Sequence, residues 1–170
     1  MDAIPRALLH GSPHKALEWF DPFHGDEDSP FGPALYLTED PAVANCYVRG
    51  TGAIYVIEVT GNGQLTIPMN ASWKALSVDA RLAIKKLFNA ANQPLPSGIN
   101  NARAILDSIE PAMNKRQCNE FLAAEGIWML FGHIDAMEDS GLCDRGIQYA
   151  LLCDAAITAQ QPWEGPRHIL

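Results

Sequence analysis

Three short stretches carry side chains that could act on a ligand: His10-Gly11-Ser12, a pair of tyrosines, and Gln148. Tyr36 and Tyr47 stand eleven residues apart, the first on an apparent strand and the second on the helix that follows it. Two such rings could form the walls of a slot for a flat ligand, or they could be ordinary packing residues. The first stretch ends one predicted strand and Gln148 lies on a late one, so a single sheet could bring all of them together.

The elements that must position these residues are mainly short strands. Apolar and β-branched runs predict strands at 7–12, 34–38, 53–59, 64–69, 127–135 and 147–155. The Gly-Asn-Gly turn at 61–63 predicts a hairpin between the third and fourth of these. Asp40 followed by Pro41 is typical of a helix start, with the aspartate as cap and the proline as first helical residue. A short helix is also expected over 14–20, and the Pro-, Gly- and Asp-rich residues 21–33 predict an irregular loop.

The pattern changes between residues 71 and about 125, where apolar residues recur at three- and four-residue spacing. This predicts a helical insert between two groups of strands. We therefore expect one α+β domain over 1–170 with a mixed or antiparallel sheet, rather than a doubly wound parallel one. Neither a GxGxxG sequence nor a Walker motif is present, so the usual phosphate-binding loops are missing.

Composition narrows the class of protein. In 170 residues, 48% are apolar, enough for a sizeable core. Twelve basic against twenty acidic residues give a net charge of −8, which argues against non-specific binding to nucleic-acid backbones. Arg81, Lys85 and Lys86 could form a local basic patch or simply a solvated helix face.

The cysteines and the apolar runs bear on the compartment. Cys46, Cys118, Cys143 and Cys153 form no CxxC pair, a pattern that favours free thiols in a reducing compartment over a disulfide framework. No apolar run approaches the roughly 20 residues that span a bilayer, and the first residues are too interrupted for a secretory signal. We therefore expect a cytoplasmic protein without a membrane partner, or one delivered into the cytoplasm of a target cell.

The ordered set of motifs resembles the ADP-ribosyltransferase fold of the diphtheria-toxin and poly(ADP-ribose) polymerase type. That family has a strand ending in His-Gly, a tyrosine strand with a second tyrosine eleven residues on, and a glutamate opening a late strand. The matching segments here are LLHGS, GPALYLTEDPAVANCY and GIQYALLCDAAI, and EGIWMLFGHID is similar to the family's closing section. The resemblance covers about 7–69 and 126–157, and it implies a split sheet interrupted here by the helical insert.

The resemblance implies a role for each motif. Gly11 would bind the carboxamide of nicotinamide through its backbone N–H and C=O, His10 would bind a ribose hydroxyl of the adenosine half of NAD, and Ser12 belongs to the same NAD-binding stretch. Tyr36 and Tyr47 would flank the nicotinamide ring. Residues 24–29 correspond to a region that approaches NAD in the family.

Gln148 departs from the family, which commonly has glutamate at that position to bind the ribose 2′-hydroxyl and stabilise the developing positive charge. An amide keeps the hydrogen bond but not the charge. The chain could therefore be a slow transferase, use a carboxylate from elsewhere such as Glu138, or be a binder without catalysis. Gly146 stands where arginine-modifying members carry Glu or Gln, so nothing favours an arginine acceptor.

Each of these residues also has a structural interpretation. His10 could be a strand-end histidine, Tyr36 an ordinary strand aromatic, and Tyr47 a core residue of its helix. Gln148 could be a polar residue on the exposed face of an edge strand. His10, His14 and His24 invite a metal site, but Pro13 disfavours a shared helical face for the first two, and we assign no metal.

The sequence hypothesis is a mono-ADP-ribosyltransferase that moves ADP-ribose from NAD to a macromolecular acceptor and releases nicotinamide. His10, Tyr36 and Gln148 are the candidate catalytic residues, and NAD is the co-substrate. The acidic balance favours a protein acceptor over nucleic acid, and the small size favours a toxin, effector or phage-type modifier, with a possible antitoxin or immunity partner. The alternatives are an NAD glycohydrolase, a catalytically silent module that binds NAD or ADP-ribose, and an interaction protein that uses residues 71–125.

Overall fold

The computed structural model describes residues 4, 6–14, 21–134 and 146–165, and they form a seven-stranded mixed sheet with helices. The α+β class with a mixed sheet is therefore confirmed. Along the chain the strands are β1 (Ala7–Ser12), β2 (Leu35–Thr38), β3 (Ala53–Val59), β4 (Thr66–Pro68), β5 (Met129–His133), β6 (Ile147–Leu151) and β7 (Ile157–Pro162). The α-helices are α1 (Pro41–Cys46), α2 (Val78–Ala90), α3 (Ala102–Asp107) and α4 (Lys115–Ala124), and the short 3₁₀ helices are η1 (Pro22–His24), η2 (Gly63–Leu65), η3 (Trp73–Ala75) and η5 (Asp154–Ala156).

The strand order is β4-β5-β6-β2-β1-β3-β7, in which only β4 and β5 run parallel. The sheet has a weak seam in its middle. β1 pairs with β3 along six residues, and β2 pairs with β6 along four. By contrast, the registered pairing of β1 with β2 in the described residues is Leu9 with Thr38 alone. The strands on the two sides of this seam are therefore held together by one residue pair of the ladder.

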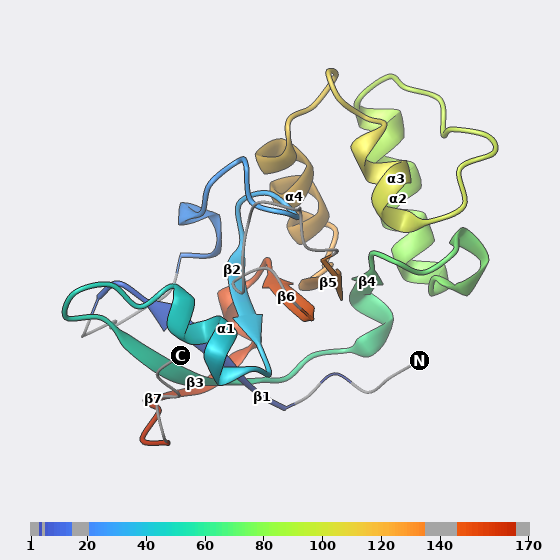
Figure 1. The fold of residues 1–170 in the computed structure, drawn as a ribbon. Coiled ribbons are helices and arrows are strands. Elements are labelled where there is room, and N and C mark those ends of the chain that lie inside the picture. Colours follow the sequence, from blue (N-terminus) through green and yellow to red (C-terminus); the bar gives the residue numbers. More distant parts are fainter. Residues whose placement is uncertain (1–3, 5, 15–20, 135–145, 166–170) are drawn as a thin grey trace.

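Helices cover one face of the sheet at two separate places. The side chains of Leu130 and Ala150 pack with helices α2, α3 and α4, whereas the alternate residues Met129 and Leu151 belong to a second core on the other face. Helix α1 lies over β1 and β3, where Ala44 packs with Leu9 and Ile54. Figure 1 shows the three insert helices grouped beside β4 and β5 and α1 beside β1 and β3, with β2 and β6 between the two groups.

The helix start predicted at Asp40 and Pro41 is confirmed, and the insert helices also begin at capping residues. The Asp40 carboxylate accepts the Ala42 amide at 2.8 Å, with Pro41 as first helical residue. In the insert, Asn101 caps α3, and Asn114 and Gln117 form a capping box on α4. The apolar residues of α2 at three- and four-residue spacing, such as Ala80, Ile84 and Leu87, are fully buried. Among the described residues no helix is long and apolar enough to cross a membrane.

Two expectations from the sequence are wrong. The hairpin at 61–63 does not form, because the chain continues into η2 and β4 pairs in parallel with β5 instead of β3. Asn62 caps η2 by accepting the Gln64 amide at 2.9 Å, and its carbonyl is bound by the Trp128 indole N–H at 3.0 Å. In addition, Cys46 is disulfide-bonded, so the expectation of free thiols holds only for Cys118 and Cys153 among the described cysteines. The helix expected over 14–20 falls mostly outside the described residues.

Candidate functional site

The candidate site lies at the seam, where β1 and β2 separate. Continuing the register from Leu9 and Thr38 would place Gly11 opposite Tyr36. Instead of a ladder bond, the Tyr36 carbonyl has a side-chain partner, Nδ1 of His10, at 2.9 Å. The His10 imidazole thus bridges the two strands at the position where the backbone ladder stops.

Burial favours the neutral form of the His10 imidazole. It lowers the pKa of His10, and the bond to the Tyr36 carbonyl opposes this effect only in part. A carbonyl can only accept, so Nδ1 carries the proton in this bond, and Nε2 of the neutral ring is then an acceptor.

The polar backbone groups of Gly11 are directed into the seam. The Trp163 amide donates to the Ile54 carbonyl at 2.9 Å, so Ile54 turns its backbone polar groups toward β7. In an antiparallel ladder, alternate residues face alternate neighbours. The partner of Ile54 is Gly11, whose N–H and C=O therefore point away from β3 and toward β2. These are the two groups that the sequence hypothesis assigns to a carboxamide.

Gly11 also has a packing reason to be glycine. A Cβ at this position would lie 1.8 Å from the Ala44 carbonyl oxygen and 3.1 Å from the Tyr47 Cβ. Helix α1 can therefore rest on β1 only because residue 11 has no side chain. The same contact places Tyr47, the C-cap residue of α1, directly beside Gly11.

The two tyrosines differ in their surroundings. The Tyr36 hydroxyl accepts the Phe31 amide at 2.7 Å and donates to the Gly32 carbonyl at 2.9 Å, and its ring stacks on Phe31 with centroids 6.4 Å apart. Burial raises the pKa of Tyr36 well above its usual value, and Tyr47 is among the groups that raise it further. Tyr47 is 40% exposed, so it is not a core residue of its helix.

Gln148 is on an interior strand rather than an edge strand. β6 lies between β5 and β2, where Gln148 is paired with Gly132 on one side and Thr38 on the other, and it is only 2% exposed. The alternative of a solvent-facing residue on an edge strand is therefore wrong. By strand alternation, Tyr36, Thr38 and Gln148 share the helix-covered face of the sheet.

The carboxylates at the end of β2 are engaged away from Gln148. Glu39 accepts a 2.6 Å hydrogen bond from the Tyr149 hydroxyl, and the Tyr149 side chain belongs to the core on the opposite sheet face from Gln148. Asp40 caps α1. Neither residue replaces the charge that the amide lacks, and Glu138 lies outside the described residues.

The remaining predicted site residues have local roles. The Ser12 hydroxyl is buried and accepts a hydrogen bond from the His14 amide at 3.0 Å. By strand alternation, Ser12 and His10 both project to the sheet face of Leu8, opposite to that of Tyr36. Within the described ranges, no group of three or more His, Cys, Asp and Glu residues could hold a metal ion.

Sequence reasoning missed two residues that belong to this region. Thr38 is buried and is the ladder partner of both Leu9 and Gln148, and Phe31 stacks on Tyr36. The Pro-Phe-Gly sequence before the tyrosine strand predicts a loop, and the aromatic residue within this turn is the one sequence signal that points to Phe31.

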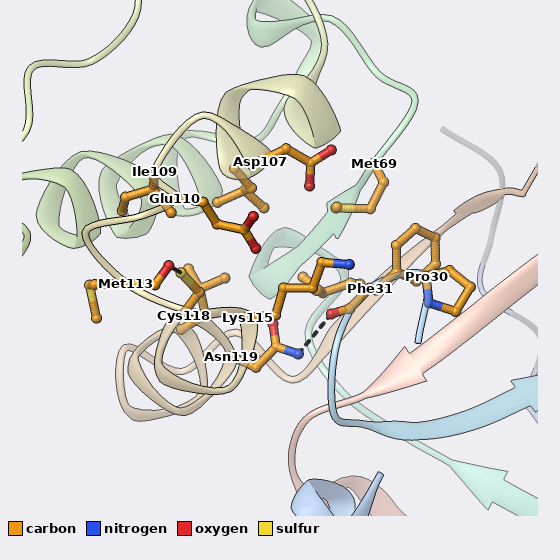
Figure 2. A pocket seen from close by; sticks show the side chains of 13 residues that line it. Pro30, Phe31, Met69, Asp107, Ile109, Glu110, Met113, Lys115, Cys118 and Asn119 are labelled. Atoms are coloured by element: carbon orange, nitrogen blue, oxygen red, sulfur yellow. Dashed lines mark hydrogen bonds between the residues drawn. The ribbon is translucent and has the colours of Figure 1, made fainter. Parts of the chain in front are cut away.

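A separate small pocket lies under the insert helices. Figure 2 shows Phe31, Met69, Asp107 and Lys115 among the residues that line it. Its volume of about 30 Å³ has room for about two water molecules, so it cannot take a dinucleotide.

Comparisons of this chain with protein-family models, curated proteins and solved structures find no match.

Proposed function

We propose that the chain is an NAD-dependent mono-ADP-ribosyltransferase that acts on a macromolecular acceptor. The observation that carries this proposal is the seam between β1 and β2. There the His10 imidazole bonds the Tyr36 carbonyl, and the Gly11 N–H and C=O face β2 beyond the last registered pair of the two strands. A planar carboxamide needs one donor and one acceptor side by side, and a residue released from its ladder supplies both.

Nicotinamide would bind at the seam, between the ends of β1 and β2, with its carboxamide on Gly11. Phe31 already covers one side of the Tyr36 ring, so the ligand would lie between Tyr36 and Tyr47. Nε2 of His10 would accept a hydrogen bond from a ribose hydroxyl. Such aromatic contacts add roughly 0.5–1.5 kcal/mol each beyond burial, so the two tyrosines would supply a substantial part of the affinity.

The reaction would break the bond between C1′ of the ribose and the nicotinamide nitrogen. The bonding electron pair leaves with nicotinamide, which departs as a neutral molecule. A nucleophile on the acceptor then forms a new bond to C1′ and loses its proton. Gln148 would hold the ribose 2′-hydroxyl through its amide, without a full negative charge to stabilise the positive ribose.

The test is nicotinamide release from NAD by the full chain, with and without cell lysate. Release only with lysate, together with a labelled macromolecule, is expected for a transferase. Tyr47→Ala should raise the KM for NAD about tenfold because it removes one wall of the slot without touching the core. Val78→Ala, which removes another exposed apolar side chain, is the matched control. Release without an acceptor would indicate a glycohydrolase instead.

A second candidate, a silent module that binds NAD or ADP-ribose, is favoured by Gln148. The chain buries an amide where a carboxylate would stabilise the transition state, and the carboxylates of Glu39 and Asp40 are used elsewhere. Gln148→Glu separates the two candidates. A rise in nicotinamide release of about 10² would indicate a degraded catalyst, since one preorganised electrostatic group has that order of effect. NAD binding without release in either protein would favour the silent module.

A further inference from the structure

The segment that leads into β2 is held by the last helix of the insert. Three residues in the first two turns of α4 make six hydrogen bonds to residues 23–33. Lys115 Nζ donates to the Ser29 carbonyl. The Arg116 amide donates to the Glu27 carboxylate, and the Arg116 guanidinium donates to the carbonyls of Phe23 and Gly25. Asn119 Nδ2 donates to the carbonyls of Phe31 and Pro33. Residues 23–33 therefore lie along the N-terminal half of α4.

Asn119 is the buried member of this set. Its side chain is 3% exposed, and its carboxamide nitrogen donates to the carbonyls of Phe31 and Pro33 at 2.9 Å each. Figure 2 shows Asn119 directed from α4 toward Phe31. An asparagine inside an apolar helix contact is unusual unless both of its amide protons have partners.

The same turn is held from its other side by the candidate site. The Tyr36 hydroxyl accepts the Phe31 amide and donates to the Gly32 carbonyl. Peptide groups 31–33 are thus bound by Asn119 from the insert and by Tyr36 from the sheet. Because both residues bond the same short turn, a shift of the turn relative to α4 moves the atoms that fix the Tyr36 ring.

Close packing leaves this turn little freedom. Gly32 has a φ of 78°, and a Cβ there would lie 2.5 Å from the Lys115 Cβ. On the other side, the Arg103 guanidinium of α3 lies over the Phe31 ring at 5.8 Å from its centroid. A side chain at position 32 would therefore clash with α4, and the turn packs against both α3 and α4.

We infer that Asn119 is a positioning residue for the nicotinamide slot and acts through the turn at 31–33 on the orientation of Tyr36. This inference rests on the proposed function. It assigns the insert a role in NAD binding, since the side chain that holds the turn comes from α4. Asn119 does not touch the ligand; its effect passes through Tyr36.

Two substitutions test this role. Asn119→Leu keeps the approximate shape and removes both donors, and Asn119→Ser leaves a smaller group with one donor. Glu120→Ala, at an exposed neighbouring position of α4, is the matched control. In the full chain, Asn119→Leu should raise the KM for NAD about tenfold, the effect of losing a buried hydrogen-bond pair, with kcat changed less than twofold. Asn119→Ser should give a smaller rise and Glu120→Ala none.

A double-variant cycle separates positioning from general stability. If Asn119 acts through the Tyr36 hydroxyl, Tyr36→Phe combined with Asn119→Leu raises the KM no further than the stronger single variant. Independent roles of the two residues predict that their effects on the KM multiply in the double variant. A merely structural role of Asn119 predicts a loss of active protein, seen as lower kcat at unchanged KM. Either result would overturn the inference.

Hydrogen exchange of the Phe31 amide tests the coupling between Asn119 and Tyr36 even if the protein shows no turnover. In the free protein, Asn119→Leu and Asn119→Ser should speed exchange at Phe31, because the turn that presents this amide to Tyr36 is loosened. Glu120→Ala should not. If the wild-type chain neither binds NAD nor releases nicotinamide, the proposed function fails, and the positioning of Tyr36 by Asn119 then stands or falls on this exchange result. Unchanged exchange in both Asn119 variants would overturn it.

Discussion

Replacing Gly11 with alanine is the sharpest perturbation of the seam. The added Cβ would lie 1.8 Å from the Ala44 carbonyl oxygen, whereas ordinary carbon–oxygen contacts begin near about 3.3 Å. Helix α1 and strand β1 would have to part by roughly 1.5 Å, and the contact atom is backbone, so no side-chain rotation relieves the clash. The helix is also fixed on its own side, because Ala44 is 1% exposed and packs between Leu9 and Ile54.

The expected cost is about 3 kcal/mol, the upper end of the range for overpacked interiors. The alanine also restricts the unfolded chain, which returns only about 0.4–1 kcal/mol. For a chain of this length, a net loss of about 2 kcal/mol lowers the Tm by roughly 4–8 °C. Gly63→Ala is the control, since a Cβ there meets no atom within 4 Å, and its Tm should remain within about 2 °C of the wild type.

Thermal unfolding followed by circular dichroism measures the global effect, and hydrogen exchange locates it. The Tyr47 amide donates to the same Ala44 carbonyl at 3.2 Å, so its exchange should rise in Gly11→Ala and stay unchanged in Gly63→Ala. A Gly11→Ala protein with wild-type Tm and wild-type exchange at Tyr47 would refute the close approach of α1 to β1. It would also remove the contact that places Tyr47 beside Gly11.

Three further outcomes follow from the described contacts. Tyr36→Phe should lower the free energy of unfolding by about 1–2 kcal/mol in urea denaturation, because the hydroxyl that bonds the turn at 31–32 is lost. Burial lowers the pKa of His10 in the folded protein, so the stability that neutral His10 contributes is complete above pH 6.5, the unfolded value, and is lost as the pH falls below it. His10→Asn keeps a donor near Nδ1 but does not titrate, so its free energy of unfolding should fall less steeply below pH 6.5. Lys86→Ala should cost less than about 0.5 kcal/mol by the same denaturation, since the 2.6 Å pair with Glu125 is at the surface and Lys86 is half-exposed.

The sequence was most informative where the signal is local. The first strand was predicted with its observed bounds, Ala7–Ser12, and the cap and first residue of α1 were both correct. These features depend on the neighbouring residues alone, such as the side chain of Asp40 and the fixed φ of Pro41. The alternation of apolar residues along β6 likewise reflects the two cores on the two faces of the sheet.

Which strands pair with one another could not be predicted from local sequence in the same way. The Gly-Asn-Gly turn is a good local hairpin signal, but Trp128 occupies the space beside it: a Cβ on Gly61 would lie 2.3 Å from the indole ring. The indole N–H and the Trp128 amide then hold Asn62 and Leu65 to the start of β5. Edge strand β7 was missed because its sequence, ITAQQP, is polar and ends in proline, which an edge strand tolerates.

The candidate site depends on local sequence patterns and on the pairing order of the strands. Residue types and order along the chain singled out His10, Tyr36 and Gln148, but their proximity depends on the strand order β6-β2-β1, which no local pattern encodes. Thr38 shows the difference, because its importance lies in being the ladder partner of Leu9 on one strand and Gln148 on the other. Asn119 is the extreme case. It is 83 positions from Tyr36 in the sequence, counted from 36 to 119, and only the shared turn at 31–33 relates the two. Long-range hydrogen bonds to backbone carbonyls leave no periodicity or motif, so residues of this kind must be found in the fold and tested by coupling rather than by single substitutions.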